Sequence, residues 1–205
     1  AQQEISTAYA TQATNMFAPL DKNRIPHKVL LDYGFEYTNL KAYNGTLSDS
    51  TVVDVPTLKH IYNTIFSSRV TSATTGFINP NNFDSNWKNR TAGTITVSGL
   101  YYKYNAFIND AINLGKVNFV NNQFQDKFVS GVWQNPYQEF QAFAMAPAIS
   151  KYEGLSFTVK IPSTIFYSNY QSLVQSIQID FGNGAGYVTV PFNQNVTVNY
   201  ATEGV

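Results

Sequence analysis

The chain has 205 residues, of which 13 are basic, 13 are acidic and 34 are asparagine or glutamine. A net charge of zero leaves no basic excess for a phosphate backbone or an anionic lipid surface, so we expect neither nucleic acid nor a membrane as partner. Cysteine is absent, which excludes disulfides and thiolate metal sites, and no apolar run approaches the roughly 20 residues of a membrane span.

The first 20 residues are rich in Ala, Thr and Gln, which predicts a mobile N-terminal segment or a short helix. The chain opens Ala1-Gln2-Gln3-Glu4, which is typical of a mature chain after an export signal has been removed. We therefore expect a secreted or outer-cell-surface protein. Residues 21–205 are expected to form a single β-rich domain, and residues 21–43, broken by Pro26 and Gly34, to be irregular packed chain with short strands.

Residues 54–70 carry a helical pattern, with apolar side chains at three- and four-residue spacing. Asp54 is a suitable N-cap, and Pro56 falls in the first turn, where its missing amide hydrogen costs nothing. An amphipathic helix near 55–70 is therefore predicted. Residues 71–92 consist mainly of turn-forming residues and predict a long exposed loop.

From Gly93 onward, β-branched and aromatic residues alternate with polar ones, which predicts strands with one buried face. The clearest alternating stretches are 94–98, 155–161, 177–181, 188–190 and 196–200. A glycine-rich turn between two of them, built on Asp180, Gly182, Asn183 and Gly184, predicts a hairpin because an Asn-Gly pair tolerates positive φ angles.

The expected fold class is α+β: a mostly antiparallel β-sandwich with one packed amphipathic helix, the sandwich lying in residues 150–205. A sandwich normally continues beyond its last alternating stretch. Because the sequence stops at Val205, just after a predicted strand, we expect the chain to be the front piece of a longer polypeptide.

The sequence shows no recognisable catalytic or metal-binding pattern. His27 and His60 have no second ligand or acid at a defined spacing. Glu139 and Glu153 are the acids nearest to apolar surroundings, but no pairing of carboxylates is visible. We therefore expect no catalytic residue, no metal and no cofactor, and hence not an enzyme.

Aromatic residues are the remaining signal, and Trp87, Tyr101 and Trp133 are the candidate ligand-binding residues. Aromatic rings flanked by amides suit a neutral sugar, because the rings stack on pyranose faces and the amides bond the hydroxyls. The alternative is that these rings fill the core, as most Phe and Tyr do.

Two stretches resemble known families. Residues 20–34, Tyr43-Asn44-Gly45-Thr46 and the helix after Asp54 resemble the amino-terminal region of large secreted multidomain proteins of the Bacteroidetes. Residues 179–187, with Val196-Thr197-Val198-Asn199-Tyr200, are similar to the strand-turn-strand of polycystic-kidney-disease-type (PKD) immunoglobulin-like repeats, although Asn183 stands where aspartate is commoner.

This resemblance implies an exported protein that uses the type IX secretion route, and it transfers no catalytic position to this chain. Three functions stay open. The first is a non-catalytic structural or interaction domain that contacts other surface protein domains, the second a carbohydrate-binding module for polysaccharide, and the third an accessory domain of a secreted hydrolase.

Overall fold

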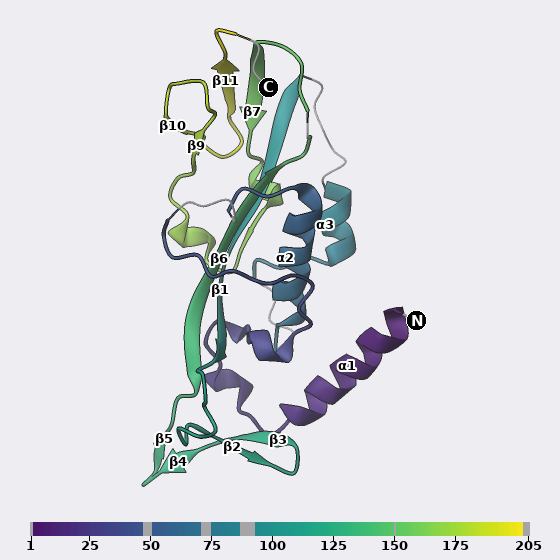
Figure 1. Ribbon diagram of the computed structural model, residues 1–205, viewed down its shortest axis with the longest axis vertical. Coiled ribbons are helices and arrows are strands. Elements are labelled where there is room, and N and C mark those ends of the chain that lie inside the picture. The colour runs from purple at the N-terminus through teal and green to yellow at the C-terminus, as the bar shows by residue number, and fades with distance from the viewer. Residues whose placement is uncertain (1, 47–50, 71–74, 87–92, 150, 203–205) are drawn as a thin grey trace. The chain divides into compact units, whose positions relative to one another are not determined.

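The computed structural model describes residues 2–46, 51–70, 75–86, 93–149 and 151–202 (Figure 1). The chain mixes helices and strands, and most strand pairs are antiparallel. Among the helices of these ranges, none combines the length and apolar character needed to cross a bilayer.

The contacts divide the chain into two compact units, each assembled from three stretches. Unit 1 comprises residues 1–42, 61–74 and 103–142, and unit 2 comprises residues 43–60, 75–102 and 143–205. A single domain over residues 21–205 stays a prediction.

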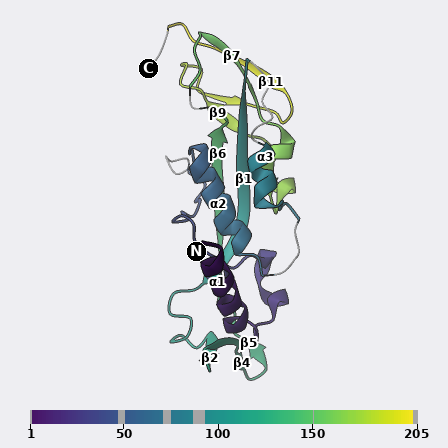
Figure 2. The same cartoon turned by 90° about the vertical axis from the view of Figure 1, so that its right-hand side faces the viewer.

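Most of the helices and strands are labelled in Figure 1 and Figure 2. The α-helices are α1 (Gln2–Met16), α2 (Val55–Ser67) and α3 (Pro80–Asn86). The strands are β1 (Thr94–Phe107), β2 (Val117–Val120), β3 (Gln123–Asp126), β4 (Phe128–Val129), β5 (Val132–Trp133), β6 (Tyr137–Pro147), β7 (Ser156–Lys160), β8 (Phe166–Ser168), β9 (Gln178–Asp180), β10 (Tyr187–Thr189) and β11 (Asn195–Asn199).

The N-terminal segment was expected to be either mobile or a short helix, and it forms helix α1. Its apolar side runs through Ala13 and on to Phe17 and Leu20, all three of which are buried in the core of unit 1. The opposite side carries exposed polar side chains. The helix is therefore held by one narrow apolar stripe.

Helix α2 is confirmed. The Asp54 carboxylate accepts a hydrogen bond from the Thr57 amide at 2.8 Å, as an N-cap does. Leu58, Tyr62 and Ile65 are fully buried, so the apolar stripe lies in the core.

The loop expected over residues 71–92 contains helix α3, so that prediction was wrong for residues 80–86. The Asn79 side chain accepts a hydrogen bond from the Asn81 amide at 2.9 Å, and Pro80 occupies the first helical position. The same residues that favour turns also begin helices. Phe83 then fixes the helix because it is buried.

Residues 21–43 are irregular packed chain, as expected, but the short strands expected there were wrong, because the described segment forms 3-10 turns instead. The turns are η1 (Lys22–Arg24), η2 (Pro26–Lys28) and η3 (Leu31–Tyr33). Gly34 follows the last turn, and a Cβ atom there would lie 2.8 Å from the backbone of Ser68. Only glycine allows this approach of the two backbones.

The sheet of unit 2 contains the C-terminal strands in an order that differs from a simple meander. β7 pairs antiparallel with β11, the last strand, and parallel with the first part of β1. β8 also pairs parallel with β1. The inward side chains of these strands include Val159, Phe166 and Val198, which are buried in one apolar cluster.

Unit 1 holds an aromatic core. Phe17 lies in ring contact with Tyr33, Phe107 and Phe124, at centroid distances of 5.5, 6.1 and 5.1 Å. Tyr137 stacks on Phe107 at 5.6 Å. Many of the aromatic residues therefore fill the core, as the alternative in the sequence analysis held.

Candidate functional site

Two short hairpins follow one another in unit 1. β2 pairs with β3, and β4 pairs with β5, both antiparallel. Each hairpin closes through two residues that both have positive φ: Asn121 and Asn122 in the first, Ser130 and Gly131 in the second. Such turns match the twist of paired strands and fix their register. Both views place the two hairpins close together (Figures 1 and 2).

The hairpins and the loop before them expose apolar side chains to solvent, with Val132 63% exposed and Val129 51% exposed. We call this set the hairpin surface: Ile112, Leu114, Phe119, Val120, Phe128, Val129 and Val132. It makes up half of the large apolar side chains found exposed in the described part of the chain. Exposed apolar side chains that gather on one part of a protein commonly mark a binding site.

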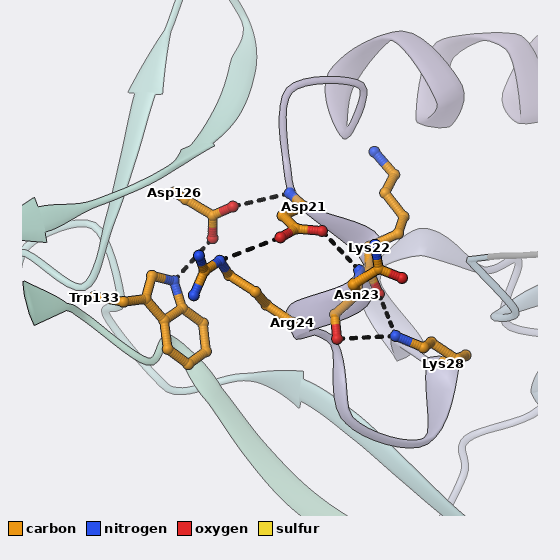
Figure 3. Close-up of polar contacts among 7 residues, drawn as sticks. All are labelled: Asp21, Lys22, Asn23, Arg24, Lys28, Asp126 and Trp133. Atoms are coloured by element: carbon orange, nitrogen blue, oxygen red, sulfur yellow. Dashed lines mark hydrogen bonds and ion pairs between the residues drawn. The ribbon is translucent and has the colours of Figure 1, made fainter.

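Trp133 anchors the second hairpin (Figure 3). Its indole nitrogen donates a hydrogen bond to one carboxylate oxygen of Asp126 at 2.9 Å. The other oxygen of Asp126 accepts a hydrogen bond from the backbone amide of Asp21 at 2.8 Å. One carboxylate thus joins β3 and β5 to the segment before η1, which lies about a hundred positions earlier in the sequence.

Arg24 completes this cluster. Its guanidinium lies 5.3 Å from the centroid of the Phe128 ring and 5.4 Å from that of Trp133, and it pairs with Asp21 at 3.3 Å. A guanidinium near two aromatic rings is attracted by the quadrupole of each ring, and this attraction stabilises the contact. The β4–β5 hairpin is therefore held in place by a charged and aromatic contact, although its strands are only two residues long.

The two lysines of the same segment bond backbone carbonyls, and the bonds of Lys28 are drawn in Figure 3. Lys28 donates to the carbonyls of Lys22 and Asn23 at 3.0 and 2.9 Å. Lys22 donates to the carbonyls of Phe17 and Ala18, just after helix α1, where a cation is favourable. This sequence-local group of positive charges therefore stabilises the fold.

Glu139 is the centre of a second polar cluster in unit 1. Its carboxylate lies 2.8 Å from the Lys103 ammonium and 2.5 Å from the His27 ring nitrogen. The hydrogen bond from Lys103, then that from His27, lowers the pKa of Glu139. Glu153, the other acid singled out from the sequence, forms an ion pair with Lys151 at 3.1 Å, and both of these side chains are about four-fifths exposed.

The three candidate sugar-binding residues have different surroundings. Trp87 lies outside the described residues. Trp133 is half-buried against the core of unit 1, and Tyr101 is half-buried against the apolar cluster of unit 2. Trp133 and Tyr101 belong to different units, and each packs against its own core.

The glycine-rich turn joins β9 and β10, which pair antiparallel. Asp180 accepts a hydrogen bond from the Gly182 amide at 2.9 Å, and Asn183 accepts one from the Ala185 amide at 3.2 Å. Positive φ occurs at Gly182, Gly184 and Gly186. The left-handed positions are thus glycines rather than Asn183, and the connection has six residues rather than two.

Two hollows adjoin the first hairpin within unit 1. The smaller, about 280 Å³, is mainly apolar and lies between the 107–113 segment and the β2–β3 strands. The larger, about 830 Å³, lies between α1 and the β2–β3 turn. We call the larger hollow the amide groove; its described lining residues are Ala8, Thr11, Gln12, Asn15, Met16, Asn121, Asn122 and Gln123.

Sequence reasoning missed both hairpins and the amide groove. The signal for the hairpins was present, since Asn121-Asn122 and Ser130-Gly131 are turn pairs between short β-favouring stretches. The groove had no sequence signal, because its two walls lie more than a hundred residues apart.

The described residues contain no group of three or more His, Cys, Asp or Glu side chains placed to hold a metal ion. No protein-family model, curated protein or solved structure matches the chain.

Proposed function

We propose that this chain is a non-catalytic interaction domain of a secreted or cell-surface protein, and that the hairpin surface binds another protein domain. The observation that carries the proposal is the set of exposed apolar side chains on two hairpins with two-residue turns and on the loop before them. An extracellular location is supported by the weakly charged, amide-rich composition.

The backbone of the hairpins favours a protein partner. β4 and β5 form a two-stranded sheet, as do β2 and β3, so in the described structure each hairpin presents outer strand edges. Unpaired amides and carbonyls on such an edge can accept an extended segment of another polypeptide. Exposed Val129 and Val132 beside that edge supply apolar contacts.

The proposal is tested by placing photoreactive benzoylphenylalanine at position 132 in the full chain, in the cell that makes it. We expect one defined protein adduct at position 132 and none at position 173, where Leu173 is also exposed but lies in unit 2. The purified partner should bind the wild-type chain and bind Val132→Ser at least tenfold more weakly. Absence of an adduct, or equal adducts at both positions, would overturn the proposal.

The immunoglobulin-like or PKD-like character of residues 150–205 and the type IX secretion route are also proposals. The antiparallel β7–β11 pair and the hairpin built on Asp180 support the first. Immunofluorescence and protease treatment of intact cells test the location: a chain found inside the cell and protected from protease contradicts it.

Carbohydrate binding is a second candidate function, which the amide groove favours. A position as accessory domain of a hydrolase is compatible with either function.

A further inference from the structure

The wall of the amide groove on α1 is one face of the helix. Its five residues, Ala8, Thr11, Gln12, Asn15 and Met16, follow the i, i+3, i+4, i+7, i+8 pattern, which places their side chains on one side. Gln12 and Asn15 on this face are exposed, while Ala13 and Phe17 on the other side are buried in the core. The helix thus presents amides to the groove, while Ala13 and Phe17 pack into the core, and Met16 both lines the groove and packs against that core.

The opposite wall is the two-residue turn of the first hairpin, followed by Gln123. Asn121 and Asn122 are both exposed and both have positive φ, 51° and 59°. Glycine is the favoured residue at the second position of such a turn, because it has no Cβ atom to strain. Glycine at position 122 would relieve backbone strain in the turn, whereas Asn122 supplies an amide side chain to the groove.

A hydrogen bond connects the two walls. The side-chain nitrogen of Gln123 donates to the backbone carbonyl of Asn15 at 3.0 Å. This bond leaves the Asn15 side chain available and ties the turn to the helix. The two walls are thereby connected without a ligand. Less conformational entropy is then lost when a ligand binds.

The chemistry of the lining selects the ligand. Each Asn or Gln amide both donates and accepts hydrogen bonds, and the described lining residues carry no charge. A ligand with many hydroxyls satisfies such groups, whereas an ion would lose hydration without gaining an opposite charge. The volume of about 830 Å³ falls in the range of small-molecule sites and accommodates a few sugar rings.

We propose that the amide groove binds a neutral oligosaccharide, with the side chains of Gln12, Asn15, Asn121 and Asn122 bonding its hydroxyls and Met16 contacting a ring face. This inference rests on the second candidate function and is independent of the hairpin surface. The described lining of the groove contains neither Tyr101 nor Trp133, each of which packs against the core of its own unit.

The test uses variants that remove amides without harming the fold. Alanine is the best helix former, so Gln12→Ala/Asn15→Ala should keep α1 intact, and Asn122→Gly should improve the turn. The matched control is Gln171→Ala, which removes an exposed amide from a short helix of unit 2. Thermal unfolding of each variant verifies that stability is kept.

The probes are cellohexaose, xylohexaose, mannohexaose and chitohexaose, with hexagalacturonate as the charged counterpart, titrated into the full chain and followed by NMR and calorimetry. We expect at least one neutral probe to shift resonances of α1 and the β2–β3 turn, and hexagalacturonate to bind more weakly. Each lost hydrogen bond should weaken binding about three- to tenfold, so both groove variants lose affinity while Gln171→Ala does not.

Binding by none of the neutral probes, or binding unchanged in both groove variants, overturns the proposal. Either result leaves the photocrosslinking at position 132 unaffected, so the failure of one proposal is distinguishable from the failure of the other.

Discussion

Trp133 was a candidate ligand-binding residue in the sequence, but in the structure its side chain holds the β4–β5 hairpin. Its ring is packed and its indole N–H is bonded to Asp126, so a sugar would have to compete with contacts that hold the hairpin. We therefore predict that Trp133→Phe lowers the free energy of unfolding by about 1–2 kcal/mol, because the bond to the carboxylate is lost while an aromatic ring is kept.

Urea denaturation of the wild-type chain and Trp133→Phe measures this difference. Asp126→Asn is the companion variant, since it keeps an acceptor but removes the charge. If Trp133→Phe unfolds at the same urea concentration as the wild-type chain, the hydrogen bond to Asp126 contributes nothing to stability.

Glu139 provides a pH-dependent prediction. Its pKa is lowered in the folded chain from an ordinary value of 4.5 by hydrogen bonds from Lys103 and His27. A carboxyl with a lowered folded-state pKa adds stability above its unfolded pKa, and this stability is lost as the pH falls through the folded pKa. Glu139→Gln should therefore be less stable than the wild-type chain at pH 7, by at most about 1 kcal/mol because the site is partly exposed.

The difference in stability between the wild-type chain and Glu139→Gln should vanish as the pH falls below 4.5. Denaturation midpoints of both chains, taken from pH 3 to 7, measure this difference. Glu153→Gln is the control, because its ion pair with Lys151 is almost fully in solvent. A constant difference between the Glu139→Gln and wild-type curves at every pH contradicts an electrostatic origin.

At the scale of elements, the β4–β5 hairpin depends on the backbone of one residue. Gly131 has φ of 80°, and a Cβ atom added there would meet nothing within 4 Å. Gly131→Ala therefore strains only the backbone conformation, and we predict that it lowers the free energy of unfolding by about 1 kcal/mol. Gly131→Asn should recover part of it, since asparagine tolerates the left-handed region.

Hydrogen exchange of the β4–β5 amides provides the measurement, with faster exchange expected in Gly131→Ala than in Gly131→Asn. Equal protection in both variants and the wild-type chain would show that the contacts of Arg24 and Trp133 alone determine the hairpin.

The elements that sequence could predict are those with a repeating pattern. Helix α2 and the strands near residues 94, 156 and 195 follow a clear period, and the structure contains them. The two-residue strands β4 and β5 are too short to show alternation. Helix α3 was missed because its capping asparagine and proline also favour turns.

The candidate site was less predictable than the fold. The cluster of Asp21, Arg24 and Asp126 joins residues that are distant in sequence, and no single stretch contains it. The groove likewise needs α1 and the β2–β3 turn together. Residue types indicated hydrogen bonding to a neutral ligand, but only the fold shows which amides share a surface.

For the whole molecule, zero net charge has a consequence for association. The isoelectric point is about 7.0, so electrostatic repulsion between copies is weakest near neutral pH. We predict a solubility minimum there, with exposed Val129 and Val132 as the contacts. Precipitation by polyethylene glycol from pH 5 to 9 checks this, and Val129→Ser/Val132→Ser should flatten the minimum.

Solubility that is unchanged over this pH range would contradict the prediction. A minimum that persists in Val129→Ser/Val132→Ser would show that other surfaces form the contacts.

The division of the chain into two interleaved units limits how its gene can change. The polypeptide passes from one unit to the other five times, and three of these crossings lie within α2, β1 and β6. No single recombination breakpoint therefore separates the units, and a crossover inside the sequence would leave each daughter gene with parts of both. In gene shuffling, the two units must therefore be gained, lost or transferred together.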